Sequence, residues 1–117
     1  MMANVFTTTG RAFVVDELDA FGTYYCGWGT GAGTAATSDT TLFTEASETR
    51  DATTDTQPSA NVLQWVGLLE ADGAKTITNA GIFDAISAGN MIVKSDFTGV
   101  VLALGDKIEF TFQLTVT

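Results

Sequence analysis

The end of the chain carries the pattern that most constrains the fold. Between residues 107 and 117 every second residue is apolar, and the residues between them are polar or charged. The apolar set is Ile108, Phe110, Phe112, Leu114 and Val116. Because successive side chains of a β-strand point to opposite faces, this period of two predicts a strand with one buried and one exposed face. Such strands are typical of antiparallel β proteins.

Shorter patterns of the same kind predict further strands. They cover residues 12–15, 21–28, 62–70, 75–86 and 91–97. A slip in the alternation at residues 79–81 is typical of a β-bulge, and residues 71–74 predict a hairpin turn between the strands on either side. Residues 45–59 are polar throughout and indicate an exposed edge strand or a long loop. Residues 29–36, rich in glycine, are predicted to be a mobile loop.

Six to eight strands without a regular alternation of strands and helices predict an all-β antiparallel sandwich or barrel. The helical signal is at most one short turn, which Ser38 or Asp39 would cap. A length of 117 residues suits one domain, which we place at residues 11–117 after an N-terminal arm at residues 1–10. Since 45% of the residues are hydrophobic and 16% are charged, the chain has the composition of a folded domain.

Residues 62–69 carry apolar side chains on both faces of their predicted strand. One face would hold Leu63, Trp65 and Leu69, and the other would hold Val62, Val66 and Leu68. A strand that is apolar on both faces needs a cover on each, which a packed loop, the N-terminal arm or another subunit could supply. We therefore expect Val62, Trp65, Val66 and Leu68 at a subunit interface, with Trp65 as its main anchor.

The charge and the rare residue types argue against several classes of function. Five Lys and Arg against fourteen Asp and Glu give a net charge of −9, which disfavours nucleic acid and membrane surfaces as partners. With no His and one Cys, we expect no enzyme activity, no catalytic residues, no cofactor and no metal site. Cys26 alternates with Tyr24 and Trp28 and is predicted to be a core residue, not a nucleophile.

Two weaker motifs have structural explanations that we favour. The glycine-rich residues 27–33 lack the spacing and the lysine of a phosphate-binding loop, so we interpret them as a flexible connector. The acidic residues at 16–19 and the pair Asp51 and Asp55 could hold a cation weakly or serve a glycosidase. Neither group matches an EF-hand loop, and solvated turns are the favoured interpretation.

Three stretches together resemble a known class of proteins. They are residues 27–31 with 38–42 and Glu45, residues 76–85 with 89–91, and Phe97, Val100 and Leu102 with Gly105, Asp106 and the C-terminal strand. Across roughly residues 21–117 the chain resembles small structural proteins of tailed bacteriophage virions, most closely the decoration (cement) proteins of phage heads.

The resemblance implies a jelly-roll-like β-sandwich that forms a homotrimer and binds the major capsid protein on the outer surface of the virion. The protein would be made in the cytoplasm of the host bacterium. The alternative is a tail-tip or fibre module that attaches the virion to its host. In either case Val5 and Phe6 in the arm are further interface candidates. The arm would be a frayed terminus, or a strand added to a sheet edge of a neighbouring subunit or of the capsid protein.

Overall fold

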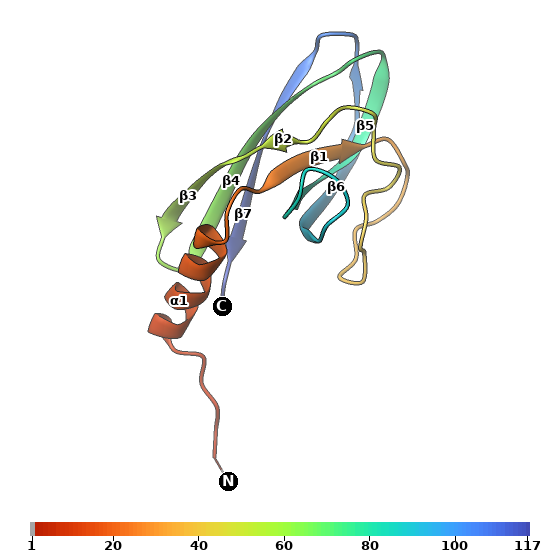
Figure 1. Cartoon of the computed structure of the whole chain (residues 1–117). Coiled ribbons are helices and arrows are strands. Elements are labelled where there is room, and N and C mark those ends of the chain that lie inside the picture. The colour runs from red at the N-terminus through yellow and green to blue at the C-terminus, as the bar shows by residue number, and fades with distance from the viewer. Residues whose placement is uncertain (1) are drawn as a thin grey trace.

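The computed structural model describes residues 2–117 as two antiparallel sheets and one helix (Figure 1). In chain order the elements are α1 (Thr8–Ala20), β1 (Tyr25–Gly29), β2 (Asp51–Ala52), β3 (Thr54–Ser59), β4 (Val62–Glu70), β5 (Lys75–Phe83), β6 (Met91–Leu102) and β7 (Lys107–Thr115). The prediction of an all-β sandwich-like fold is confirmed. The jelly-roll likeness implied by the resemblance stays a prediction.

The chain passes from one sheet to the other three times. The first sheet has the order β2-β1-β5-β6 and the second the order β3-β4-β7. The crossings lie at Thr53, at residues 71–74 and at residues 103–106. Strands that switch sheets at a corner tie the two layers together. Residues 51–52 and 54–59 form short edge strands, one in each sheet. The segment 45–59, predicted to be an edge strand or a loop, is thus edge strand from residue 51 on and loop before it.

The strongest patterns of alternation form the predicted strands. β4 spans residues 62–70 as expected, and it pairs along its whole length with β7, from Val62 opposite Thr115 to Glu70 opposite Lys107. The irregularity expected near residues 79–81 is present as a shift in the β5–β6 register between Ile77 and Asn79. Leu63 and Trp65 share one face of β4, as the alternation predicts, and this face is buried, as is Phe112 of β7.

The predicted hairpin at residues 71–74 is wrong, because β4 and β5 lie in different sheets. The connection is held instead by the turn that joins β6 to β7. The Ala71 N–H donates to the Asp106 carbonyl at 2.8 Å, and the Gly105 N–H donates to the Ala71 carbonyl at 2.9 Å. These two hydrogen bonds place both crossings at the same end of the molecule.

The first twenty residues also differ from the prediction. Residues 12–15 belong to the 13-residue helix α1 and not to a strand, and the helix includes the last three residues of the predicted arm. Thr7 caps the helix, since its side-chain oxygen accepts a hydrogen bond from the Gly10 N–H at 3.0 Å. The helical turn expected at Ser38 is absent from the described residues, where the Asp39 carboxylate instead closes a turn onto the Ala36 N–H.

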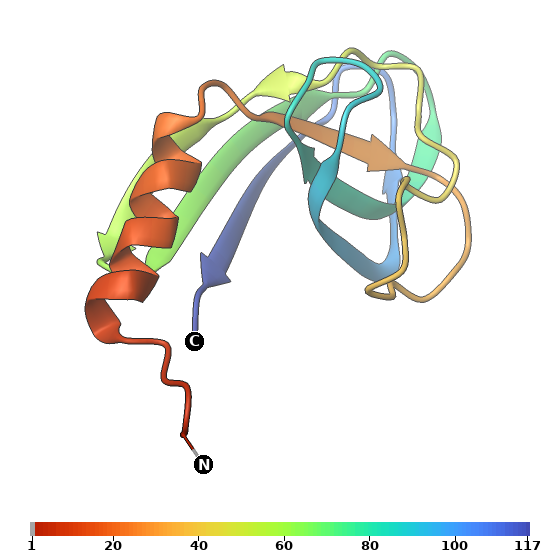
Figure 2. The same cartoon turned by 60° about the horizontal axis from the view of Figure 1, so that its bottom comes forward.

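Helix α1 and the first sheet share one face of the second sheet. Figure 2 shows α1 beside β3 and β4 at one end, with β1, β5 and β6 at the other. Val15 of α1 is fully buried in the core with Trp65 and Ile77, and the Tyr24 hydroxyl donates to the Leu18 carbonyl at 2.6 Å. The first sheet covers only part of this face of the second sheet, and α1 covers another part of it.

The loop at residues 30–50 packs against the side of the first sheet that points away from the second sheet. Its glycine-rich start is predicted to be a flexible connector, but the Gly31 N–H donates to the Phe43 carbonyl at 2.8 Å and the Thr30 N–H to the Thr44 carbonyl at 3.0 Å. A β-carbon on Gly29 would stand 2.5 Å from the Phe43 carbonyl oxygen. Glycine therefore allows two backbone segments to pack closely here.

Candidate interaction surface

The structure divides the predicted interface residues among three places. Trp65 has no exposed surface and packs edge-on against Tyr24, so it belongs to the core of its own chain. Val62, Val66 and Leu68 lie together on the opposite side of β4, where Val62 and Val66 are half-buried and Leu68 is 47% exposed. That these three residues meet a partner stays a prediction, now without Trp65 as their anchor.

Around Val62 and Val66 the second sheet presents a face without charged side chains. We call it the outer face, and its members are Thr54, Thr56, Val62, Gln64, Val66, Thr111, Gln113 and Thr115. The Gln113 amide donates to the Gln64 side-chain oxygen at 2.7 Å, which joins the two strands across the middle of the face. Charged side chains begin only at its border, where Leu68 lies opposite Glu109. In a chain of net charge −9 an uncharged sheet face is a surface suited to protein contact.

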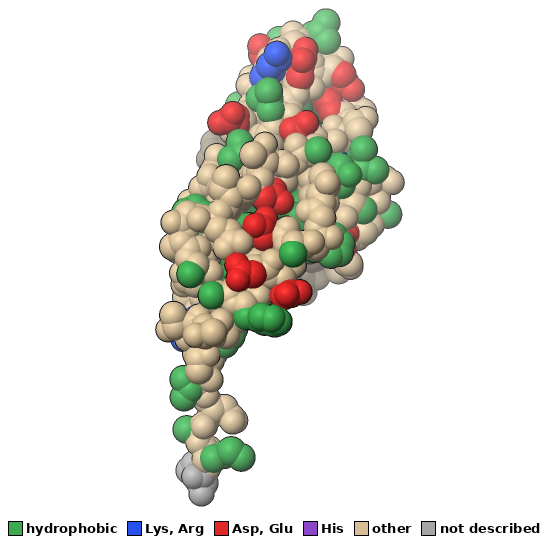
Figure 3. Space-filling view, turned by 60° about the vertical axis from the view of Figure 1, so that its left-hand side comes forward, with side chains coloured by type: hydrophobic (Ala, Val, Ile, Leu, Met, Phe, Trp, Pro, Cys, Tyr) green, Lys and Arg blue, Asp and Glu red, His purple; other side chains and the backbone are tan. Residues whose placement is uncertain are grey.

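Val5 and Phe6 lie on a second exposed element. Residues 2–7, which we call the N-terminal tail, extend beyond the body of the molecule, and Figure 3 shows hydrophobic side chains along this narrow extension. Val5 is 78% exposed and Phe6 is 43% exposed. The tail does not form a strand and pairs with no sheet edge of its own chain.

A third surface was missed by the sequence analysis. Helix α1 and the start of β6 enclose a hollow of about 340 Å³, which we call the helix groove. Its apolar lining is Phe13, Val14, Leu18, Phe21, Tyr24 and Ile92, and Phe13 and Phe21 are 63% and 62% exposed. The spacing of Val14, Leu18 and Phe21 at i, i+4 and i+7, after a capping threonine, was the signal that could have revealed this helix.

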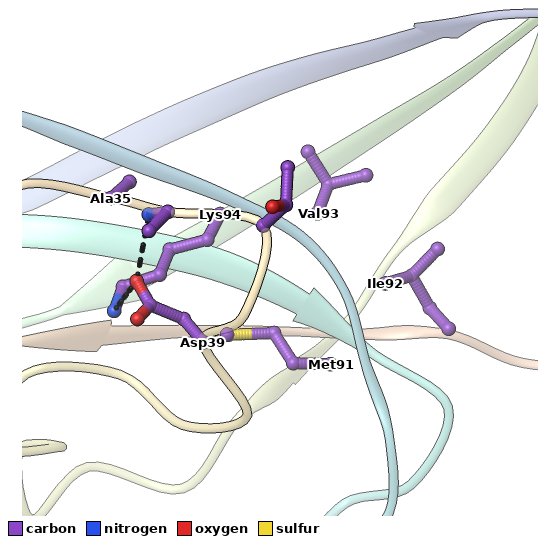
Figure 4. A pocket seen from close by; sticks show the side chains of 8 residues that line it. Ala35, Asp39, Met91, Ile92, Val93 and Lys94 are labelled. Atoms are coloured by element: carbon purple, nitrogen blue, oxygen red, sulfur yellow. Dashed lines mark hydrogen bonds and ion pairs between the residues drawn. The ribbon is translucent and has the colours of Figure 1, made fainter.

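An ion pair of the chain itself spans a hollow of about 330 Å³ between residues 35–39 and residues 91–94. Lys94 and Asp39 point toward one another across it (Figure 4), with Lys94 Nζ 2.9 Å from the Asp39 carboxylate. The same ammonium donates to the Thr41 carbonyl at 2.9 Å and lies 3.2 Å from the centre of the Phe43 ring. The hydrogen bond from the Ala36 N–H, together with that from Lys94, lowers the pKa of Asp39. Lys94 is thus engaged on three sides, and it fastens the loop instead of binding a ligand.

A second ionic cluster, around Glu48, also holds the loop at residues 30–50 in place. Burial opposes the ionisation of Glu48, but hydrogen bonds from Lys75 and from the Asp72 N–H outweigh it and hold the pKa of Glu48 at about 2. The Trp28 indole N–H also donates to this carboxylate, at 2.9 Å. Glu48 therefore joins the loop to the core residue Trp28 and to the start of β5.

The single cysteine of the chain is buried in the core. Burial, and secondarily the nearby Asp51, raises the pKa of the Cys26 thiol to about 12, so the thiol is protonated and unreactive at neutral pH. Within residues 2–117 no three Cys, Asp or Glu side chains come together as a metal site would require. The described part of the chain also has no helix with the length and hydrophobicity needed to span a membrane.

No protein-family model matches the chain, and neither a curated protein nor a solved structure has significant similarity to it. The character of its surfaces and the local sequence patterns therefore carry the inference of its function. Those surfaces are an uncharged sheet face, an apolar groove and an exposed apolar tail, all of which suit contact with other proteins.

Proposed function

We propose that the chain is a structural protein of a tailed-phage virion, which decorates the outer surface of the capsid. As a homotrimer it would bind neighbouring major capsid subunits and hold them together against the pressure of the packaged DNA. The protein would act without catalysis, cofactor or metal. The sequence resemblance suggests this role.

The observation that carries the proposal is the outer face. Side chains of threonine, glutamine and valine from three neighbouring strands make one continuous area without charge. An uncharged area of this kind can contact the surface of an assembled shell without burying an unpaired charge. Its polar groups can form hydrogen bonds to that surface directly or through water.

Trimerisation would raise the affinity for the capsid, even though each copy makes only a modest contact. A single outer face offers few large apolar side chains, so one copy alone would bind weakly. When three copies are joined, the second and third contacts become intramolecular, and the overall affinity rises by about 10²–10⁴. Capsid subunits that touch the same trimer would then be linked to each other.

Binding to capsids that lack the protein tests this proposal. Purified protein is mixed with such capsids, and the bound fraction is measured by co-sedimentation. Thr111 lies opposite Val66 on the outer face, and Thr111→Glu would place a charge in the contact, so we expect at least about tenfold weaker binding.

The matched control is Thr98→Glu, which adds the same charge at an exposed threonine of β6 in the other sheet. It should bind as the unaltered protein does. Equal binding by both variants would show that the outer face is not the contact. Failure of the unaltered protein to bind any capsid would overturn the proposal and favour the tail-tip or fibre alternative.

A further inference from the structure

The N-terminal tail and the helix groove are apolar surfaces without a cover, and both belong to the same end of the fold. Met2 and Val5 are 82% and 78% exposed, and residues 2–9 contain no charged side chain. The groove offers about 340 Å³ lined mainly by aromatic and aliphatic side chains. The tail therefore has the chemistry that the groove would accept.

Local contacts direct the tail away from the groove of its own chain. The Phe6 ring lies over Gly10, 3.2 Å from where a β-carbon would stand, and Thr7 holds extended backbone angles of φ −69° and ψ 158° while it caps α1. To enter its own groove, the tail would have to reverse direction at Thr7. The cap and the contact with Phe6 would then be lost.

Charge at the two surfaces is also complementary. Arg11 lies at the base of the tail, with its guanidinium 5.7 Å from the centre of the Phe6 ring. Of the Lys and Arg residues it is the one without an ion pair within residues 2–117, and its Nε is buried without a hydrogen-bond partner there. The rim of the groove carries two acidic residues, Glu17 and Asp84. A tail entering the groove of another copy would bring an unpaired positive charge toward this negative rim.

We propose that the N-terminal tail of one copy docks into the helix groove of the next copy, with Val5 among the aromatic side chains of the groove. The contact joins two different surfaces, so it is heterologous, and repeating it around an axis closes a ring. This inference deepens the proposed function, because it names the contact that would hold the proposed trimer together.

The test measures the mass of the full-length protein in solution by size-exclusion chromatography with light scattering. The unaltered protein is expected to be a trimer at micromolar concentration. Val5→Asp in the tail and Phe13→Asp in the groove should each weaken assembly about 10–100-fold, the loss typical of one buried anchor. Val101→Asp is the control, because Val101 is an exposed apolar residue (80%) on β6 that lines neither surface, and it should remain a trimer.

A cross-link distinguishes exchange between copies from docking within one copy. In a protein carrying both Val5→Cys and Phe13→Cys, mild oxidation should give covalent dimers and trimers on a non-reducing gel. Neither single variant should give trimers, and the native Cys26 is buried and should not react. Because the residues changed are exposed, circular dichroism should show the fold of every variant to be intact.

Three results would overturn the inference: a monomeric unaltered protein, an oligomer that Val5→Asp leaves unchanged, or a cross-link confined to single chains. Capsid binding separates these failures from failure of the proposed function. An oligomer indifferent to Val5→Asp that still binds capsids would refute the tail contact alone. A tail-dependent oligomer without affinity for capsids would support the tail contact and refute the proposed role.

Discussion

At the scale of single residues, burial determines the reactivity of the Cys26 thiol. Cys26 is fully buried between the sheets, and the pKa of its thiol is raised to about 12. We expect a thiol reagent such as Ellman's reagent to leave the folded protein unmodified and to react with one thiol per chain after unfolding in guanidinium. Rapid modification of the folded protein at neutral pH would contradict the position of Cys26.

Close contact between the two sheets requires a glycine at position 67. A β-carbon on Gly67 of β4 would stand 2.5 Å from the β-carbon of Cys26, so neither sheet could keep its place. We expect Gly67→Ala to lower the free energy of unfolding by about 1–3 kcal/mol, measured by chemical denaturation. Gly73→Ala is the control, because no atom lies within 4 Å of the added carbon. Equal stability of the two variants would contradict this packing.

The free energy of unfolding depends on pH because the pKa of Glu48 differs between the folded and the unfolded chain. Its pKa is about 2 in the folded protein, against about 4.3 in an unfolded chain. The carboxylate therefore stabilises the fold fully above about pH 4.3, and this contribution is lost as the pH falls toward 2. The full loss amounts to about 3 kcal/mol.

Denaturation of Glu48→Gln at pH 6 and at pH 3 measures this contribution. We expect the free energy of unfolding to fall less in the variant than in the unaltered protein. Some loss remains, because hydrogen bonds also lower the pKa values of Asp39 and Asp84 in the folded state. Identical pH dependence in both proteins would show that Glu48 is not held as described.

At the scale of the elements, Arg50 is one of the side chains that hold the loop at residues 30–50 on the first sheet, beside Lys94 and Glu48. Arg50 forms two hydrogen bonds of 2.8 Å to the Glu45 carboxylate and two of 2.9 Å to the carbonyls of Ala85 and Ala88. Its guanidinium lies 3.5 Å from the centre of the Phe83 ring. A single side chain thus joins the loop, the end of β5 and the turn that follows.

Replacing this arginine should cost far more than replacing a surface lysine. We expect Arg50→Met to lower the free energy of unfolding by about 3 kcal/mol, since the buried guanidinium is lost, the carbonyls of Ala85 and Ala88 lose their donor and Glu45 loses its partner. Lys107→Met breaks the exposed pair with Glu70, at 3.9 Å, and should cost less than about 1 kcal/mol. Thermal denaturation of both variants makes the comparison, and a similar loss in each would contradict the special position of Arg50.

The sequence predicts individual strands much better than it predicts their partners. Alternation is a local property, so β4 and β7 are evident from the chain alone. Residues 71–74 have the composition of a hairpin turn, but the next strand joins the other sheet because of contacts with residues 103–106, which are far along the chain. No local pattern carries that information.

Helix α1 was missed for a different physical reason. Residues 12–15 contain phenylalanine and valine, which favour strands by intrinsic preference, and packing of Val15 and Leu18 against the second sheet overrides that preference. Because α1 was not predicted, the helix groove that it lines was not predicted either. The sequence pattern predicts that β4 is apolar on both faces, but it does not show which face the chain covers itself. Trp65 lies on the covered face and not at an interface, where it was expected.

At the scale of the whole molecule, the potential binding surfaces lie on different parts of one elongated body, 57 Å in its longest dimension. The outer face covers the second sheet, and the tail and helix groove belong to α1 and its surroundings. In the proposed arrangement the helix end joins copies to each other, and the sheet face joins the trimer to the capsid. Separation of the two contacts is what allows three copies to bind one shell at the same time.

The copy number of the protein in purified virions tests the proposed role most directly. It can be measured by gel densitometry or quantitative mass spectrometry of virions from a phage that encodes the chain, relative to the major capsid protein. Decoration of the capsid predicts a copy number that approaches that of the major capsid protein. A few copies per virion, or none, would contradict the proposal, and a small number found on isolated tails would favour the tail-tip or fibre alternative.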